Sequence, residues 1–439
     1  MTENERYTGA GKWTLPRVGA LVGIAALIVT LAGFGLSRTR EPEPEETWPG
    51  TVSTSDTPET EEASQLPEEL SDAEGVLPPE ELEKQSQSWL SRLVHPPTKA
   101  EKLLSEMSIR DKVYQLFIVF PDQLTGKAPV TEAGEDVKDG LDRYPVAGIL
   151  FDRDNIRGGE QIYTLLKEMQ SYSRIPLLMT CDEEGGRVNR LMSNAGTPNV
   201  GPMLSYRDKG PGTARANAVT IAHGLTSCGF NMDFAPVADV WSNPANTVIG
   251  NRAYSTDFDE AAELVRAAVN GFHEGGVACT LKHFPGHGDT YEDSHNGLAK
   301  VYRTKQQLQD AEWKPFRAGI AAGADAVMVG HLIAGEIDPE PATVSRVMVT
   351  DILRNELGFT GVVITDSLQM DAVTENYTSG EIALQAIEAG VDILLAPEFL
   401  SEAAEALLSA VEEGRLPESR IDESVSRILN LKEAYGLLG

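Results

Sequence analysis

Basic residues are scarce in this sequence. Lys and Arg together number 37, against 67 Asp and Glu, which gives a formal net charge of −30. Proteins that bind nucleic acid neutralise phosphates with clustered Lys and Arg, so this balance argues against that class of protein. Much of the negative charge is local, because 15 acidic residues and no Lys or Arg lie between Glu41 and Glu83.

Cysteine is also rare. The three cysteines are Cys181, Cys228 and Cys279, an odd number that cannot pair completely within one chain. Each stands in an apolar or strand-like context, which favours buried structural thiols over a disulfide framework.

Charged residues are absent from 18–36, a run of 19 residues. A helix of that length spans roughly 28 Å, close to the thickness of the hydrocarbon core of a bilayer. The sequence therefore predicts a transmembrane signal anchor over 18–36, preceded by a cytoplasmic tail over 1–17. This places the protein at the cell membrane as a single-pass protein, with the remainder outside the cytoplasm, or secreted if the segment is cleaved.

Large apolar residues are few in the next segment, 37–96, which is rich in Pro, Glu, Ser and Thr. Such a composition cannot bury enough apolar surface to offset the entropy of ordering the chain. We expect a disordered acidic linker here.

The region 97–439 alternates short apolar runs with amphipathic helical patterns. Continuous apolar runs are typical of parallel strands that are covered on both faces. Eight strand–helix units predict a (β/α)₈ barrel of the TIM type, an α/β fold, as a single catalytic domain. The expected strands are 115–120, 147–151, 176–181, 231–236, 278–283, 326–331, 361–365 and 392–397.

Polar residues collect where these strands end, which is where barrel enzymes place their catalytic groups. The third strand runs into DEEGGRVNR (182–190), and the fifth runs into KHFPGHGD (282–289) and then DSH (293–295). The seventh ends in TDSLQM (365–370). Many charges and few aromatic residues at one barrel end suit a small ligand rich in hydroxyl groups.

These motifs, with IGNRAY (249–254) and PATVS (341–345), resemble family 3 of the glycoside hydrolases. The similarity is to the single-domain β-N-acetylglucosaminidase branch, and it extends from about residue 100 to the C-terminus. The resemblance implies an exo-acting enzyme that removes terminal non-reducing N-acetyl-β-D-glucosamine from carbohydrate substrates such as peptidoglycan fragments. It implies neither a metal nor an organic cofactor.

The resemblance also implies the roles of individual residues. Asp366 falls on the nucleophile of the family, which forms a covalent glycosyl intermediate. Asp293 and His295 fall on its acid/base dyad. The residues that fall on the sugar-binding pocket are Asp182, Arg190, Arg252, Lys282, His283 and Met370, the last near the acetamide side. Glu183 stands where many relatives have Gln, and its side chain is expected to point away from the sugar.

Elementary chemistry is consistent with these roles. A retaining glycosidase needs a carboxylate nucleophile and a second group that first gives and then takes a proton. An imidazole titrates near pH 6.5, so His295 suits proton transfer, and Asp293 can hold its other nitrogen. We interpret His331 and Asp239 as mainly structural residues.

Three other interpretations remain open on the sequence alone. His283, His287, Asp289, Asp293 and His295 could be zinc ligands of a metal-dependent barrel hydrolase. The same fold could transfer the sugar to phosphate as a phosphorylase, because a His acid/base does not repel an anion. It could also bind sugar without turnover.

Overall fold

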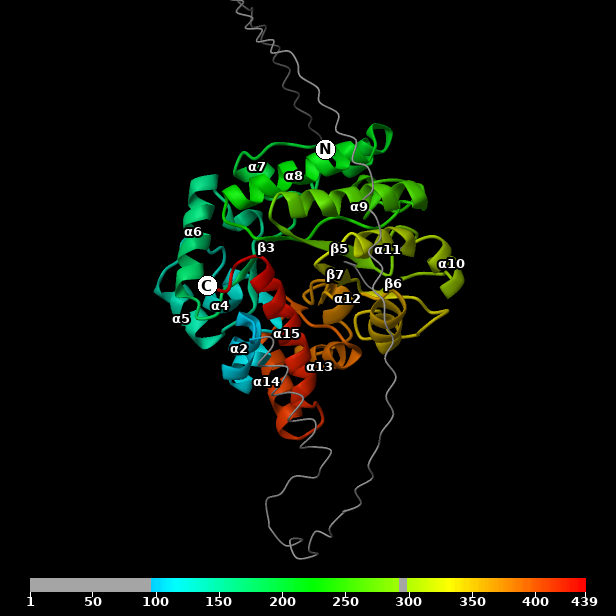
Figure 1. The fold of residues 1–439 in the computed structure, drawn as a ribbon. Helices are drawn as coiled ribbons and strands as arrows, with labels where there is room; N and C mark the ends of the chain where they lie inside the picture. The colour runs from blue at the N-terminus through cyan, green and yellow to red at the C-terminus, as the bar shows by residue number, and fades with distance from the viewer. Residues whose placement is uncertain (1–95, 292–297) are drawn as a thin grey trace, which may run out of the picture. The chain divides into compact units, whose positions relative to one another are not determined.

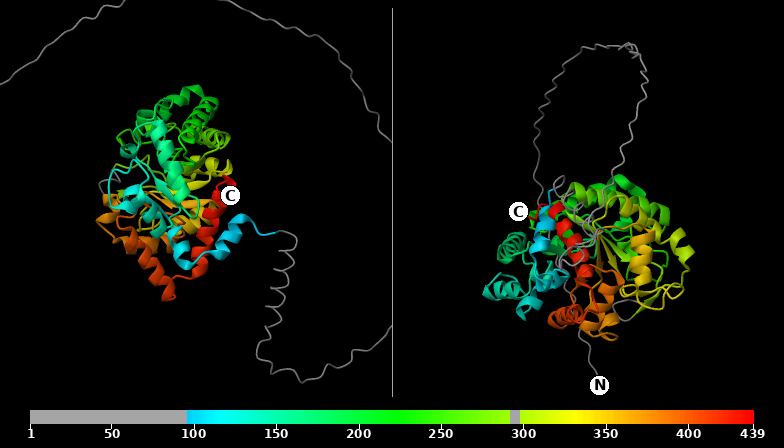
Figure 2. Two further views of the ribbon diagram at one scale, coloured as in Figure 1. Left: turned by 90° about the vertical axis from the view of Figure 1, so that its left-hand side faces the viewer. Right: turned by 60° about the horizontal axis from the view of Figure 1, so that its bottom comes forward.

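The computed structural model describes residues 96–291 and 298–439. Eight parallel strands form the centre, and the helices lie outside them (Figures 1 and 2). The strands are β1 (Phe117–Val119), β2 (Gly148–Leu150), β3 (Leu178–Cys181), β4 (Met232–Asp233), β5 (Ala278–Phe284), β7 (Ala326–Val329), β9 (Val362–Thr365) and β10 (Leu394–Leu395).

The sheet curls into a nearly closed barrel. Its strands follow the order β10-β1-β2-β3-β4-β5-β7-β9, and every pair is parallel. A parallel bridge between Ile364 and Ile393 links the two edge strands, supported by a 3.0 Å hydrogen bond from the Thr365 N–H to the Ile393 carbonyl. Each of the eight predicted strands overlaps one of these strands, so the predicted TIM-type barrel fits the structure.

The helices follow the strands along the chain. In Figure 1, α8 (Pro211–Ser227) and α9 (Phe258–Glu274) lie side by side, and α2 (Lys99–Glu106) packs against α15 (Glu418–Ala434) from the other end of the chain. The remaining helices are α3 (Ile109–Tyr114), α4 (Pro121–Thr125), α5 (Glu135–Arg143), α6 (Gly159–Tyr172), α7 (Leu191–Asn194), α10 (Lys305–Asp310), α11 (Trp313–Ala321), α12 (Asp371–Thr374), α13 (Ser379–Ala389), α14 (Leu400–Glu412), a π-type helix η4 (Val347–Glu356) and the 3₁₀ turns η1 (Arg153–Asn155), η2 (Met203–Lys209) and η3 (Gly250–Arg252).

Several helices begin where the sequence offers a capping residue. Thr378 caps α13 by accepting the N–H of Glu381, whose side chain bonds back to the Thr378 N–H. Asp257 caps α9 by accepting the N–H groups of Asp259 and Glu260. Such caps satisfy backbone donors that have no partner within the helix and stabilise it by about 1 kcal/mol.

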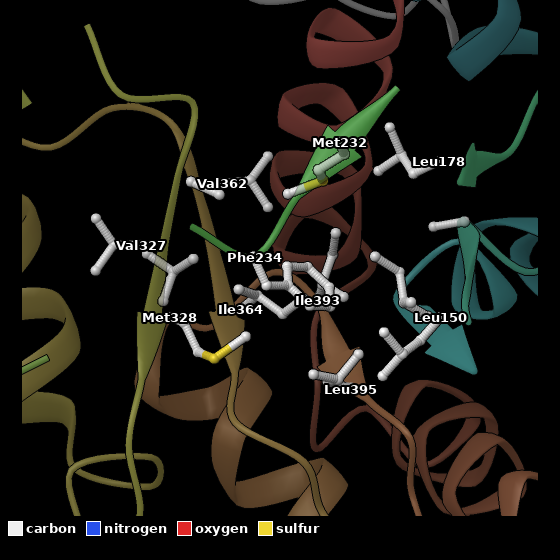
Figure 3. Close-up of a cluster of buried hydrophobic side chains, with 14 of the residues drawn as sticks. Leu150, Leu178, Met232, Phe234, Val327, Met328, Val362, Ile364, Ile393 and Leu395 are labelled. Carbon is white, nitrogen blue, oxygen red and sulfur yellow. The ribbon is translucent and has the colours of Figure 1, made fainter. Parts of the chain in front are cut away.

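Apolar side chains fill the barrel interior. Figure 3 shows Leu150, Phe234, Ile364 and Leu395, which come from different strands or their ends, gathered in one cluster. All four are at least 95% buried, and full burial of such a side chain contributes about 1.5–3 kcal/mol. Leu150, Phe234 and Leu395 also line the pocket described below, so the top of the core forms the apolar part of its wall.

A small second sheet lies outside the barrel. Its parallel strands are β6 (Ala299–Lys300) and β8 (Leu332–Ile333), so the chain that follows residue 297 is hydrogen-bonded beside the segment that leaves β7.

The three cysteines are buried and free, which confirms the prediction of structural thiols.

The prediction of a transmembrane helix is corrected. Within 96–291 and 298–439, no helix is long and apolar enough to cross a membrane. The longest helices there, α8, α9 and α15, have 17 residues each and turn only one face toward the core, whereas a crossing needs about 20 predominantly apolar residues. Residues 18–36, with the predicted tail over 1–17 and nearly all of the predicted linker over 37–96, lie outside the described residues.

Candidate active site

A pocket of about 720 Å³ opens at the C-terminal ends of the barrel strands. Seven of the nine residues that the sequence singled out line it, although they come from distant parts of the chain. They are Asp182, Arg190, Arg252, Lys282, His283, Asp366 and Met370. The other two, Asp293 and His295, lie outside the described residues.

Asp366 follows β9 directly and is half-buried in the pocket wall. Its backbone N–H donates to the Val329 carbonyl at 2.9 Å, which continues the barrel ladder and fixes where the side chain starts. The Oδ1 atom accepts the N–H of Ser367 at 2.8 Å, whereas Oδ2 accepts no hydrogen bond from the described residues. One carboxylate oxygen is therefore held by the backbone and the other is available to a ligand.

The surroundings of Asp366 favour its ionised form. Burial works to raise the pKa of this carboxyl group, but the positive charge that His283 and His331 can carry, the Ser367 N–H and Lys282 lower it by more. Its pKa therefore lies below the ordinary value for aspartate. An anionic carboxylate with a free oxygen is chemically suited to act as a nucleophile.

His331 supports this segment from behind. It is almost fully buried and does not line the pocket. Its Nε2 atom lies 3.0 Å from the Ser367 carbonyl oxygen, and its Nδ1 atom lies 2.8 Å from the Thr343 hydroxyl. Donation from Nε2 to that carbonyl would hold the residue that follows Asp366, in line with a mainly structural role.

A cage of alternating charges forms one side of the pocket. The Lys282 ammonium lies 2.6 Å from Asp182 Oδ1 and 2.7 Å from Glu184 Oε1. Glu184 in turn accepts two hydrogen bonds from Arg252, at 2.9 Å from Nε and 2.8 Å from Nη2. Paired charges of this kind hold their donors and acceptors in fixed directions, as recognition of sugar hydroxyl groups requires.

Glu184 is a site residue that was not predicted from the sequence, as is Asp152 in the pocket wall. The Glu184 side chain is only 1% exposed, and burial works to raise its pKa, but Arg252 and Lys282 lower it by more, so its pKa lies far below the ordinary value. A signal was present in the sequence, because side chains along an extended segment alternate in direction. Asp182 and Glu184 are two positions apart and face the pocket, whereas Glu183 does not line it.

Glu183 binds the backbone of the following helix instead of facing the pocket. Its carboxylate accepts the backbone N–H groups of Arg190, Leu191 and Met192 at 2.5, 2.8 and 3.1 Å, at the start of α7. The prediction that its side chain points away from the pocket is confirmed. Through these bonds it also fixes the backbone of Arg190, whose guanidinium lies 3.4 Å from Asp182 Oδ2 and pairs with Asp152 at the pocket wall.

Two glycines allow this turn after β3. Gly185 and Gly186 have φ values of 87° and 62°, which favour residues without a Cβ atom. A Cβ atom at Gly186 would lie 2.8 Å from the Cα atom of Pro202. The glycines therefore let the segment from Asp182 to Arg190 fold back tightly against residues 200–203.

His283 is oriented by a buried carboxylate. Its Nδ1 atom lies 2.6 Å from Asp239 Oδ2, and its Nε2 atom lies 3.4 Å from Arg252 Nη2. Asp239 also accepts the backbone N–H of His287 at 2.6 Å, so one structural carboxylate holds both histidines of the KHFPGHGD motif. His287 lines the pocket wall but is 2% exposed.

Of the five residues that could be zinc ligands on the sequence alone, the structure describes His283, His287 and Asp289. Asp289 does not line the pocket, and its carboxylate accepts a hydrogen bond from Arg303 Nε at 2.9 Å. His283 and His287 lie with ring centroids 5.9 Å apart and with their Nδ1 atoms directed to Asp239 and Thr290, respectively. Asp293 and His295 belong to the undescribed segment.

The fold and the pocket define a class of protein, a (β/α)-barrel enzyme with a polar pocket at the C-terminal strand ends. The particular family follows from comparison with known proteins. The model of the glycosyl hydrolase family 3 N terminal domain matches residues 108–431, and the chain belongs to this family. This is the family that the sequence motifs resemble.

Three relatives illustrate the similarity. Beta-hexosaminidase A of Pseudoalteromonas piscicida is 32% identical over 70% of this chain and 56% of its own length. Beta-hexosaminidase of Stenotrophomonas maltophilia strain K279a is 37% identical over 63% of this chain and 84% of its own. The structure of a family 3 beta-N-acetylglucosaminidase from Paenibacillus sp. str. FPU-7 matches with a TM-score of 0.71 and 40% identity, over 75% of this chain and 63% of that one. The chain thus spans less than two thirds of the first and third of these relatives.

Proposed function

We propose that this enzyme hydrolyses terminal non-reducing N-acetyl-β-D-glucosamine residues with retention of configuration, through a covalent intermediate on Asp366. The observation that carries the proposal is the placement of Asp366, whose carboxylate lies in the pocket wall with its Oδ2 atom free of hydrogen bonds from the described residues. Its lowered pKa favours the ionised form. Attack of Oδ2 on the anomeric carbon forms the glycosyl ester, and water then cleaves it.

The charge cage supports a sugar as the ligand. Asp182 and Glu184 accept hydrogen bonds, while Lys282 and Arg252 donate them. The pocket therefore offers both an acceptor and a donor to a sugar hydroxyl group. Met370 adds an apolar contact next to the nucleophile, which suits the acetamide methyl group. The names of the relatives, beta-hexosaminidases and a beta-N-acetylglucosaminidase, agree with this substrate.

In this proposal His295 gives a proton to the leaving oxygen and later accepts one from the attacking water, with Asp293 orienting its imidazole. These roles rest on the sequence motif. Peptidoglycan fragments are the proposed natural source of the sugar.

Hydrolysis is proposed over phosphorolysis on charge grounds. The cations Lys282, Arg252 and Arg190 are each already paired with a carboxylate, which leaves Arg187, bonded to the Thr247 and Ile249 carbonyls, as the one described pocket cation without a carboxylate partner for an inorganic anion. Product analysis in phosphate buffer tests this directly, with free N-acetylglucosamine expected and the sugar 1-phosphate as the contrary result.

An assay with aryl glycosides tests the proposed activity. We expect turnover of aryl N-acetyl-β-glucosaminide and little turnover of the α-anomer. NMR of the first-formed product should show the β-anomer. The Asp366→Asn variant should lose roughly 10⁴-fold in kcat and still bind N-acetylglucosamine, because the amide keeps the shape of the site but cannot attack. Full activity in this variant would refute the proposal.

A further inference from the structure

A second cluster of reactive side chains lies at the opposite end of the barrel from the pocket. His273 is the penultimate residue of α9, Cys279 is near the start of β5, and Asp325 directly precedes β7. The same strand β5 carries Lys282 and His283 toward the pocket at its other end. The three side chains meet although 46 positions separate Cys279 from Asp325.

The ligand atoms of this cluster are close to one another. His273 Nε2 lies 3.0 Å from Asp325 Oδ2 and 3.8 Å from Cys279 Sγ, and one ligand atom from each residue falls within a common span of 4.8 Å. Zinc binds imidazole nitrogen at about 2.0–2.1 Å and thiolate sulfur at about 2.3 Å, so tetrahedral neighbours lie roughly 3.3–3.6 Å apart. The two separations from His273 Nε2 differ from these values by only a few tenths of an ångström, and the third, from Cys279 Sγ to the Asp325 carboxylate, is at most 4.8 Å and would shorten on binding.

The surroundings of the cluster resemble the outer shell of a metal site. The Asp325 Oδ2 atom accepts the Tyr435 hydroxyl at 2.9 Å and the Cys279 N–H at 2.9 Å, which fixes the direction of the carboxylate, and an ion between His273 and Asp325 would replace the 3.0 Å contact between Nε2 and Oδ2. Partners of this kind orient first-shell ligands and raise metal affinity. The His273 side chain is 31% exposed, and Asp325 also lines a surface cavity of about 370 Å³, so an ion has a route from solvent.

The metal-free cluster holds protons that a metal would replace. Burial and, to a smaller degree, the Asp325 carboxylate raise the pKa of the Cys279 thiol well above its ordinary value. The hydrogen bond to Asp325 raises the pKa of His273. Metal binding therefore releases the thiol proton to solvent, together with an imidazole proton where His273 is charged, and leaves thiolate, imidazole and carboxylate as ligands.

We propose that His273, Cys279 and Asp325 form a binding site for a divalent transition metal of the zinc type, with water in the fourth position. One nitrogen, one sulfur and one oxygen ligand suit Zn²⁺ and its spectroscopic substitute Co²⁺ rather than Mg²⁺ or Ca²⁺, which prefer oxygen. The bound ion would join α9, β5 and the start of β7 and so stabilise the fold. It takes no part in sugar chemistry at the opposite barrel end.

Cobalt titration of the full chain tests the site. A thiolate ligand gives Co²⁺ a charge-transfer band in the near ultraviolet, which histidines of the sugar pocket cannot produce. We expect this band in the wild type and in Cys228→Ser, the matched control, because Cys228 is also a buried free thiol but lies outside the cluster. The band should be absent in Cys279→Ser.

A second measurement distinguishes loss of the metal site from misfolding of the Cys279→Ser variant. Excess Zn²⁺ should raise the unfolding temperature of the wild type and of Cys228→Ser but not that of Cys279→Ser or His273→Gln, while Cys279→Ser keeps its glycosidase activity. The proposal is overturned if the wild type shows no cobalt–thiolate band, or if the band survives in Cys279→Ser. Neither result would bear on the role of Asp366.

Discussion

Both carboxylate oxygens of Glu184 accept hydrogen bonds from Arg252, at 2.9 Å from Nε and 2.8 Å from Nη2. Its Oε1 atom also lies 2.7 Å from the Lys282 ammonium, so one buried anion positions two pocket cations. Bidentate pairs of this kind combine strength with a fixed geometry. Glu184 is therefore a positioning residue for these two cations, which we propose to bind the sugar.

Replacing Glu184 by Gln should lower kcat/KM about 10²-fold. The amide keeps the volume but removes the charge, which leaves Arg252 and Lys282 buried with too little compensation, and breaking a buried pair costs about 3–5 kcal/mol. Steady-state kinetics on an aryl glycoside measures the effect. A purely structural residue would lower the amount of folded enzyme without changing KM, so a rise in KM is the specific readout.

Glu183→Gln is the matched control for that variant. Glu183 is the adjacent buried carboxylate, but it caps α7 and does not line the pocket. Burial raises its pKa, so loss of its charge costs less, and the Gln side-chain oxygen can still accept the Arg190 and Leu191 N–H groups that Glu183 Oε2 holds. We expect kcat/KM within about threefold of the wild type. Equal losses in both variants would remove Glu184 from its positioning role.

His295→Ala should separate substrates by their leaving groups. A general acid matters most when the departing oxygen is basic, and general acid–base catalysis contributes roughly 10²–10⁴-fold. Turnover of a natural disaccharide should therefore fall far more than turnover of a dinitrophenyl glycoside. Equal losses on both substrates would contradict the acid role of His295.

Lys432 offers a prediction about stability. Its ammonium group is completely buried in α15 and donates to Gln115 Oε1 at 2.7 Å. Burial lowers its pKa from 10.5 to about 7. At pH values between these two pKa values, Lys432 is protonated in the unfolded chain but not in the folded protein. The group therefore makes the free energy of unfolding rise with pH.

Replacing Lys432 by Met should make the free energy of unfolding depend less on pH in this range. We expect the variant to gain stability near pH 7, by at most a few kcal/mol, because deprotonation no longer opposes folding and the loss of the Gln115 hydrogen bond offsets part of the gain. Urea unfolding at several pH values between 7 and 10 measures this. An unchanged slope of stability against pH would show that Lys432 is not neutral in the folded protein.

The barrel could be predicted from the sequence because each of its strands is buried on both faces. Such strands appear as continuous apolar runs, as in 326–331 and 361–365. The lengths of seven of the eight strands were overestimated, whereas β5 extends one residue beyond its predicted end. The predicted strand 392–397 shrinks to Leu394–Leu395, partly because the side chain of Asp392 accepts the Val363 N–H at 2.9 Å.

The site could be predicted only in part. Asp366 and Lys282 stand at strand ends within specific motifs, which local sequence reveals. The bond between Glu184 and Arg252 joins residues 68 positions apart, and only the barrel brings them together. The cluster of His273, Cys279 and Asp325 escaped notice for the same reason. The predicted location outside the cytoplasm stays a prediction.

Covalent trapping tests the central claim most directly. A fluorinated N-acetylglucosaminyl fluoride slows hydrolysis of the glycosyl ester, so the intermediate accumulates and can be mapped by proteolysis and mass spectrometry. We predict a single label on the Oδ2 atom of Asp366, detected as a glycosylated peptide that contains this residue. A label on another side chain, or steady turnover of the reagent with no label, would contradict the account.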